Sequence, residues 1–477
     1  MNLYIFAIGG SGSRVIRSLT MLLAAGVHAD SNIIPIIIDP DTSNGDLART
    51  VNVLRTYEDI RKELSYDTTL KNKFFSAEIA SLNNNGNYLL PLVGTSGINF
   101  DHYLGLGSMS QENQALAKML FSNNNLSSTM DVGFHGNPNI GSIVLNQFTQ
   151  SENFKNFEAN FVSGDKVFII SSIFGGTGAS GFPLILKTLR TSKNSALASA
   201  PIGAVSLLPY FNLKTDEKST IQADSFITKT KAALLYYEKN VTGNNTLNDI
   251  YYLGDDFSSQ GYNNCDGGNG QLNDAHFIEL LGALAVLDFD AKQLANANIT
   301  TSFHEFGLNT TPTDSILFSD LGNQTNAILK KPLSMMAIMN SYLNNRSKDH
   351  RKGQKWAKDR SALLGESFFN GAFYSNYSGF KTMFEEWISE MERNKISFTP
   401  FAQDSSIKNS DGLEKIKGLK PTYPGLNPFR KKGYDLIDEM LGNNLSSIPA
   451  NTKASTAFME VFYKTLSEIC KKNLNVQ

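Results

Sequence analysis

The 477-residue chain has few cysteines, no long apolar stretch and no signal-peptide pattern at its start. Cys265 and Cys470 are its two cysteines, too few for a disulfide framework or a cysteine-based metal site. No stretch approaches the roughly 20 apolar residues that a membrane-spanning helix needs. The first residues, MNLYIFAIGGSGS, lack the basic start and long apolar region of a signal peptide. We therefore expect a cytoplasmic protein without a membrane span.

The chain also lacks an excess of charge of one sign. Its 43 lysines and arginines stand against 45 aspartates and glutamates, for a net charge of -2. A balanced chain has no overall field to attract nucleic acid or an anionic membrane, so a compact ligand is the better expectation. The length leaves room for two or more domains.

Residues 167–190, VFIISSIFGGTGASGFPLILKTLR, combine a strand pattern, a glycine-rich turn and a helix. The apolar, β-branched run 167–173 is typical of a strand covered on both faces of a parallel sheet. The turn at 174–181 offers accessible backbone N–H groups, and Pro183 suits the first turn of the helix that follows. A helix that begins in a glycine turn can bind phosphate at its N-terminus, although such a turn can also be only a tight connection.

A second unit of the same kind stands at the start of the chain. Residues 3–8 predict a buried strand, residues 9–14 (GGSGSR) a glycine loop, and the apolar run from Val15 onward a helix. The dinucleotide fingerprint G-x-G-x-x-G, counted from Gly10, would require glycine at position 15. Because Val15 stands there, an NAD-binding loop is less well supported.

The next predicted strand, residues 33–38, is followed by Asp39 and Asp41. Ligands of parallel sheets bind at the carboxyl ends of strands, although these acids can also solvate the strand end or cap the next helix. Residues 45–130 are polar and rich in asparagine, and we interpret them as an insertion. The turn-dense run 131–141, DVGFHGNPNIG, comes next.

In this order, three of these segments resemble the nucleotide loops of the tubulin/FtsZ family, of which the chain looks like a divergent bacterial member. GGSGSRVI at 9–16 is similar to the first glycine loop of FtsZ. GNPNIG at 136–141 is similar to the GHPNIG-like third loop, and FGGTGASG at 174–181 to the GGGTG(S/T)G signature. The resemblance covers about residues 1–300 apart from the insertion, and it is weak beyond them.

The resemblance implies a fold, a ligand and an assembly. We expect an α/β, doubly wound, tubulin/FtsZ-like nucleotide-binding domain with a central helix over residues 1–297, and a divergent C-terminal α+β domain over 298–477. The expected ligand is GTP or GDP, with Mg²⁺ bound through the nucleotide. Family members assemble head to tail, so the expected partner is a second copy of the chain. The implied nucleotide-binding residues are Gly9, Gly10, Ser11, Gly12, Ser13, Arg14, Asp41, Gly136, Asn137, Pro138, Gly175, Gly176, Thr177, Gly178, Ala179, Asn273 and Asp274.

Each group in this set has an implied role. Residues 9–14 and 175–179 would hold the phosphates, and Asn137 would lie beside the terminal phosphate. Asn273 or Asp274 would cap the central helix and reach the base.

Some positions depart from the family pattern. Phe174 stands where the first signature glycine would be, and Ala179-Ser180 replaces the usual Ser/Thr-Gly. Arg14 occupies a position at which FtsZ carries asparagine near the base. The preference for guanine therefore stays open, and we expect Arg14 to touch the nucleotide by stacking on the base or pairing with a phosphate.

In tubulin and FtsZ, hydrolysis is completed by acidic residues of a neighbouring subunit, on a loop after the central helix. The most similar residues here are Asp288 and Asp290 of VLDFD, which come early for a helix of the family's length. We favour the alternative that they are ordinary polar positions of a helix that continues through Gln293, since the residues there are good helix formers. We expect any GTP hydrolysis to be slow.

Two other functions fit parts of the pattern: a Rossmann-type NAD-dependent oxidoreductase, and a nucleotide-dependent scaffold that binds without turnover. The dinucleotide fold needs one glycine loop at its first strand, whereas three separate loops here match one polyphosphate. Farther along the chain, the pattern predicts a strand at 314–321 and helices at 331–343, 381–394 and 455–471.

Overall fold

The computed structural model describes most of the chain, namely residues 1–130, 133–213, 224–255, 261–262, 268–294, 300–306, 308, 315–346, 356, 361–394, 397–403, 412–424, 430–449 and 451–476. At its centre lies a six-stranded sheet whose strand pairs are all parallel, in the order β2-β1-β3-β4-β6-β8. The strands are β1 (Asn2–Ile8), β2 (Asn32–Ile38), β3 (Lys166–Ser172), β4 (Ile202–Leu207), β6 (Asp249–Leu253) and β8 (Ser302–His304). The expected α/β class with a parallel sheet is confirmed.

The order of the strands reverses between β1 and β3. In β1, Tyr4 lies opposite Ile34 of β2 on one side and opposite Val167 of β3 on the other. The chain then adds β4, β6 and β8 outward from β3. These first strands are mostly buried and apolar, as strands covered on both faces of a parallel sheet are. Such a reversal leaves a crevice at the carboxyl ends of the two strands beside it.

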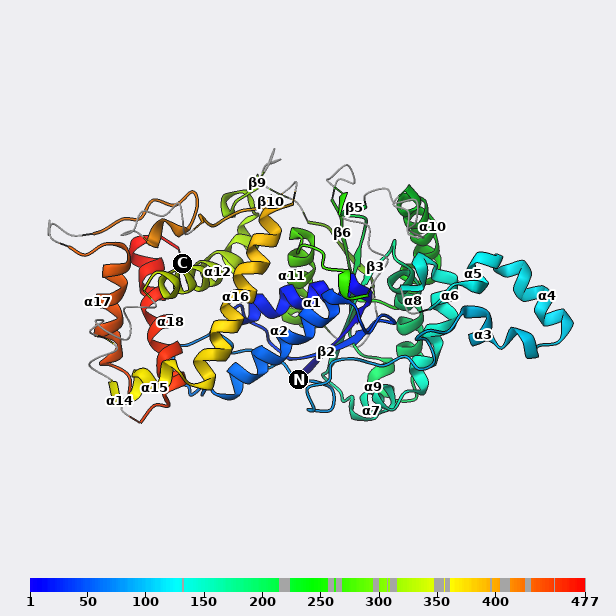
Figure 1. Cartoon of the computed structure of the whole chain (residues 1–477), viewed down its shortest axis with the longest axis horizontal. Helices are drawn as coiled ribbons and strands as arrows, with labels where there is room; N and C mark the ends of the chain where they lie inside the picture. The colour runs from blue at the N-terminus through cyan, green and yellow to red at the C-terminus, as the bar shows by residue number, and fades with distance from the viewer. Residues whose placement is uncertain are drawn as a thin grey trace.

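Helices cover both faces of the sheet (Figure 1). α1 (Gly9–Ala24) and α11 (Phe277–Ala291) pack together on one face, α8 (Gly176–Arg190) lies on the other, and α2 (Gly45–Lys62) packs on α1. The remaining α-helices described before residue 300 are α3 (Phe100–Leu104), α4 (Gln111–Leu120), α5 (Asn123–Ser127), α6 (Pro138–Val144), α7 (Glu152–Asn160), α9 (Ser195–Ala198) and α10 (Asp224–Asn240).

Much of each predicted glycine loop is already helical. α1 begins at Gly9, directly after β1, and α8 begins at Gly176. Pro183, expected in the first turn of its helix, therefore lies well inside α8. Proline has no N–H to donate to the carbonyl four residues earlier, and the hydroxyl of Tyr237 donates to that carbonyl, at Ala179, over 3.2 Å. A side chain of α10 thus replaces the missing helical hydrogen bond.

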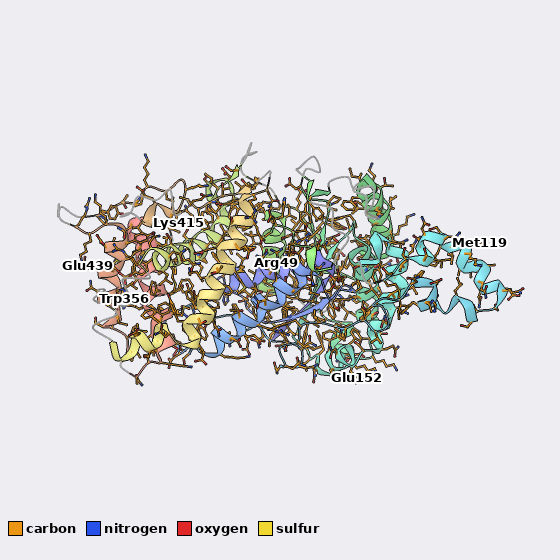
Figure 2. All side chains as sticks on the ribbon, viewed as in Figure 1. Arg49, Met119, Glu152, Trp356, Lys415 and Glu439 are labelled. Atoms are coloured by element: carbon orange, nitrogen blue, oxygen red, sulfur yellow. The ribbon has the colours of Figure 1, made fainter. Side chains whose placement is uncertain are left out.

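Residues 45–130, expected as one insertion, fall into two parts. α2 buries one side, and single bridges from Ile33 to Ile79 and from Ile37 to Leu89 hold the chain after α2 beside β2. α3, α4 and α5 instead project at one end of the molecule, with Met119 near the tip (Figure 1, Figure 2). α4 has no buried residue. Phe100, Phe121 and Leu126 are buried in the core, so the part that stands apart from it is α4.

Beyond residue 300 the described chain is mainly helical. The expected helices at 331–343, 381–394 and 455–471 are present with different ends, and the strand expected at 314–321 shortens to two residues. The elements are α12 (Asn323–Arg346), α14 (Ser361–Leu364), α15 (Glu366–Phe369), α16 (Ala372–Glu392), α17 (Gly433–Leu445), α18 (Ala454–Asn473), β9 (Ser315–Ile316) and β10 (Ser397–Phe398). The β9–β10 pair is parallel, and β5 (Asn212–Leu213) pairs in the same way with β7 (Gly261–Tyr262). Within the ranges given above, none of the helices is long and apolar enough to cross a membrane.

Candidate functional site

A cleft lies at the carboxyl ends of β1 and β3, where the strand order reverses. Its walls come from the residues that follow β1, β2, β3 and β4, and from the segments that precede α6 and α11. The lining residues are Gly9, Gly10, Ser11, Arg14, Asp39, Asp41, Asn44, Gly133, Gly136, Ser172, Phe174, Gly175, Gly176, Thr177, Gly178, Phe211, Phe226, Gln271 and Asn273. Open parallel sheets bind their ligands at such a reversal, so this cleft is the candidate site.

The N-termini of α1 and α8 meet at the floor of the cleft. A Cβ built on Gly9 would lie 3.4 Å from Cβ of Thr177 and 4.0 Å from the backbone nitrogen of Gly178. Neither helix has a side-chain cap or an acidic residue in its first turn, whereas Asn44 caps α2 and His276 caps α11. Two uncapped N-termini present unpaired backbone N–H groups and the positive ends of two helix dipoles. This arrangement favours an anion with several oxygen atoms, such as a polyphosphate.

Close packing explains most of the glycines in these first turns. A Cβ at Gly12 would come within 2.8 Å of the backbone of Ala7, and one at Gly178 within 2.5 Å of the carbonyl oxygen of Ser172. A Cβ at Gly176 would lie 2.5 Å from the carbonyl oxygen of Gly133. Gly10 is different, because a Cβ there would meet no atom within 4 Å. Gly10 lines the cleft, and its missing side chain therefore leaves open space there.

The segment 133–137 closes the cleft over the start of α8. Gly133, Phe134 and Gly136 all have positive φ, at 50°, 55° and 67°. Phe134 is fully buried, so its packing holds a backbone conformation that a side chain disfavours. Asn137, expected beside a terminal phosphate, caps α6 by accepting the N–H of Asn139 at 3.0 Å. Its backbone and that of its neighbours, not its side chain, face α8.

Two carboxylates stand at the end of β2. Burial, with Asp41 and Asp46 nearby, raises the pKa of Asp39 to about 7. Asp41 accepts hydrogen bonds from the hydroxyl of Ser43 at 2.8 Å and from the N–H of Gly268 at 2.7 Å. Carboxylate oxygens suit Mg²⁺ when phosphates supply the other ligands. In the part of the chain that the structure describes, no cluster of three or more His, Cys, Asp or Glu side chains could hold a metal by itself.

Arg14 lines the cleft, but three groups of the chain hold its guanidinium. Nε donates to Glu279 at 2.5 Å, Nη1 to Asp46 at 3.1 Å and Nη2 to the hydroxyl of Tyr210 at 2.6 Å. Arg14 is 4% exposed, and burial raises the pKa of Glu279. The structure therefore gives Arg14 a role in fixing α1, α2 and α11 around the cleft. The expected direct contact with a base or phosphate would require these bonds to break.

The same ionic network reaches the C-terminal helices. Arg49, near the centre of the molecule in Figure 2, bonds to Asp46 and donates to Glu390 of α16 at 2.7 Å. Glu390 also accepts from Arg17 at 2.7 Å and from the backbone N–H of Ala275 at 2.8 Å. All the carboxylates in this network are 1% exposed. Buried charges of this kind are stable only while each keeps its partner.

An aromatic wall faces the two helix N-termini. Phe174 packs against Phe226 with ring centroids 5.0 Å apart and against Phe211 at 5.5 Å. Phe211 comes from the segment that follows β4. Aromatic rings at a phosphate-binding cleft provide a surface on which a base can stack.

The start of α11 differs from the expectation. His276 caps the helix, with Nδ1 accepting the N–H of Ile278 at 3.1 Å, and burial together with Arg14 lowers the pKa of His276 to about 3. The cap predicted at Asn273 or Asp274 was wrong by two or three residues. Asn273 lines the cleft and donates its amide to Asp46, whereas Asp274 pairs with Arg393 at the surface.

Asp288 and Asp290 lie in the last turn of α11, at the opposite end of the sheet. The helix ends at Ala291, so the predicted continuation through Gln293 was wrong. Asp290 is 1% exposed and accepts the backbone N–H groups of Asp30 and Ser31, just before β2. Asp288 is half-exposed and pairs with Lys292 at 3.0 Å. A seven-residue strand such as β1 spans about 20 Å, so neither acid can reach the cleft of its own chain.

The structure brings most of the predicted binding residues together. Those at the cleft are Gly9, Gly10, Ser11, Arg14, Asp41, Gly136, Gly175, Gly176, Thr177, Gly178 and Asn273. Those outside its lining are Gly12, Ser13, Asn137, Pro138, Ala179 and Asp274. Sequence reasoning missed Asn44, Gly133, Ser172, Phe226 and Gln271. Ser172 could have been found as the last residue of a strand whose next residues carry the signature.

No family model and no curated protein matches the chain. Among solved structures, CetZ from Methanosaeta thermophila strain DSM 6194 is 15% identical over 53% of this chain and 46% of that chain, with a TM-score of 0.27. CetZ2 from Haloferax volcanii, described as a GTPgS-bound protofilament, is 13% identical over 61% of this chain and 59% of that chain, with a TM-score of 0.29. This chain thus spans about half the length of these two proteins. Similarities this weak do not establish a fold, which rests here on the strand order and connections of the chain itself.

Proposed function

We propose that the chain is a tubulin/FtsZ-like protein that binds GTP or GDP in this cleft and assembles head to tail into filaments. The observation that carries the proposal is the meeting of two uncapped helix N-termini at the reversal of the sheet. One anion-binding helix start is common, whereas two so close that a Cβ on Gly9 of α1 would touch Thr177 of α8 match a chain of phosphates. The three resembling sequence segments lead to this same place.

The residues of the cleft suit the parts of a nucleotide. The first turns of α1 and α8 would hold the phosphates through backbone N–H groups. When bound, the nucleotide supplies the phosphoanhydride bond, and Mg²⁺ offsets part of its charge. Asp39 and Asp41 are the carboxylates beside that position. Asn273 commits its amide nitrogen to Asp46, which leaves its amide oxygen to accept from the N–H groups of a guanine.

The dinucleotide alternative is less well supported by the same geometry. Val15 stands where the fingerprint needs its third glycine, and it packs toward Gly282 of α11. A Cβ on Gly282 would already lie 3.0 Å from the Val15 side chain. The close contact between α1 and its neighbour is therefore made in a different way from that of the dinucleotide fold.

The position of α11 bears on hydrolysis. Its start lies at the cleft and its acidic end lies at the amino ends of β2 and β3. An acid at that end could act on a nucleotide only in a neighbouring copy, stacked head to tail. Asp290 is buried, with Oδ2 held by two backbone N–H groups, whereas Asp288 is half-exposed and is therefore the better candidate for positioning water. Because it is paired with Lys292, turnover should be slow and should require assembly.

The direct test is the identity of the nucleotide that the purified protein carries. We expect GTP or GDP to be released on denaturation, and the emptied protein to bind both while binding NADH no better than an unrelated protein does. Sedimentation and negative-stain images with each nucleotide test the assembly. Binding of NADH alone would contradict the ligand, and a strict monomer with GTP at tens of micromolar protein would contradict the filament.

A further inference from the structure

Lys229 of α10 lies beside the cleft, in contact with the lining residue Gly136. Its Nζ donates to the carbonyl oxygen of Gly136 at 2.9 Å and lies 3.2 Å from where a Cβ of Gly136 would stand. Gly136 lines the cleft, and its carbonyl carbon would be 3.1 Å from a Cβ on Gly176. The backbone of Gly136 therefore lies between the ammonium group and the first turn of α8.

The same helix already contributes to the cleft one turn earlier. Phe226 lines the cleft, and residues three and four positions apart lie on one face of a helix. Lys229 and Thr230 therefore share the face of Phe226. Thr230 is 8% exposed, and its hydroxyl has no hydrogen-bond partner among the described residues. This face of α10 thus carries two polar groups whose bonding capacity is not used up within the described chain.

Among the described residues at the cleft, Lys229 is a cation that no described carboxylate neutralises, so it could pair with an anionic ligand. Arg14 is the one cation among the lining residues that the structure describes, and Asp46 and Glu279 neutralise it. Asp39 and Asp41 add negative charge to the lining. Lys229 forms no ion pair with a described carboxylate, and burial lowers its pKa. An ammonium group has three donors, and the Gly136 carbonyl takes one of them.

We propose that Lys229 binds the terminal phosphate of the nucleotide and so makes the cleft prefer a nucleoside triphosphate to a diphosphate. The inference rests on the proposed function, because it assigns one contact of the same ligand. A diphosphate seated on the two helix N-termini would leave Lys229 on its carbonyl. A triphosphate would extend toward the 133–136 segment and give the two free donors an anionic acceptor.

The test compares the affinities of two variants for GTP and GDP in Mg²⁺. Lys229→Gln should weaken GTP binding by about 10- to 100-fold, the usual worth of a hydrogen bond to a charged group. It should change GDP binding less than about twofold. Lys229→Arg should keep most of the preference for GTP. Lys231→Gln, which removes an exposed lysine from the same helix, is the matched control and should bind both nucleotides as the parent does.

The outcomes separate the inference from the proposed function. An equal loss of GTP and GDP affinity in Lys229→Gln would mean that the lysine only supports the 133–136 backbone, and would overturn the inference. Unchanged affinities would overturn it as well. Failure of the parent protein to bind either nucleotide would instead refute the proposed function, and the inference with it. If Lys229→Gln does not fold, Lys229→Met keeps the apolar stem and gives the same comparison.

Discussion

Gly10 offers the sharpest test of the cleft, because adding a methyl group there should affect the ligand and not the fold. The residue lies in the first turn of α1 with a φ that other residues adopt, and a Cβ would meet no atom within 4 Å. Gly10→Ala should therefore fold normally and gain up to about 1 kcal/mol in the free energy of unfolding, since alanine favours a helix over glycine. The neighbouring glycines cannot serve, because a Cβ on Gly12, Gly176 or Gly178 would strike backbone atoms of the protein.

A bound phosphate would change this result. Its oxygens would lie within hydrogen-bonding distance of the backbone N–H groups around Gly10, in the space that the new methyl group fills. Crowding of this kind costs about 1–3 kcal/mol, so the dissociation constant for GTP or GDP should rise about 5- to 150-fold. Isothermal titration gives the affinity and chemical denaturation gives the stability. The two quantities should move in opposite directions.

A matched control is available in α16. Gly379 is an exposed helical glycine, and a Cβ there would also meet nothing within 4 Å. Gly379→Ala should stabilise the protein in the same way and leave nucleotide affinity unchanged. If Gly10→Ala is stable and binds GTP as tightly as Gly379→Ala does, the N-terminus of α1 does not touch the ligand and the proposed seat of the phosphates is wrong.

Three other predictions follow from the buried charges. Folding raises the pKa of Asp39 to about 7, from about 4 in the unfolded chain. The contribution of Asp39 to the free energy of unfolding is therefore full below about pH 4 and is lost as the pH rises to about 7. Because Asp39 becomes charged at the cleft, GDP affinity in EDTA should fall over about pH 6–8, and Asp39→Asn should remove that fall. Asp290→Ala should lower the free energy of unfolding by about 1–3 kcal/mol for each of the two N–H groups that it leaves without an acceptor. Asp288→Ala should lower it by less than about 1 kcal/mol and should reduce only assembly-dependent GTP turnover. Denaturation curves measure the stability, and phosphate release measures the turnover. Arg14→Ala should destabilise the fold by about 3–5 kcal/mol by leaving Asp46 and Glu279 unpaired, and an unchanged denaturation midpoint would contradict the internal role of Arg14.

Local patterns predicted the frame of the site. The apolar runs of β1 and β3, each followed by glycines, were enough to expect two helix starts at one edge of a parallel sheet. What they could not show were the partners that meet from distant parts of the chain. Arg14 looked like a ligand contact because it ends the first glycine loop, yet its partners Asp46, Tyr210 and Glu279 come from three other elements.

Similar limits explain the errors in helix boundaries. Pro183 was placed in a first turn because proline usually breaks a helix interior, but Tyr237 supplies the lost hydrogen bond from a helix more than fifty residues away. The cap expected at Asn273 or Asp274 is instead His276, with which Glu279 completes a capping box. Sequence reasoning overlooked it because histidine is not a usual cap. Each difference depends on tertiary contacts that no short sequence window contains.

Glu390 accepts hydrogen bonds from Arg17, Arg49 and the N–H of Ala275, so it ties α16 to the part of the chain that forms the cleft. A truncation at residue 297, the boundary suggested by the sequence, would remove α16, leave the buried Arg17 facing no carboxylate and leave Arg49 with Asp46 alone. Losing one partner of a buried pair commonly costs about 3–5 kcal/mol, a large share of the stability of an ordinary domain. Residues 1–297, which carry the cleft, should therefore not fold as a separate product, and the two halves should unfold in a single step when the whole chain is denatured.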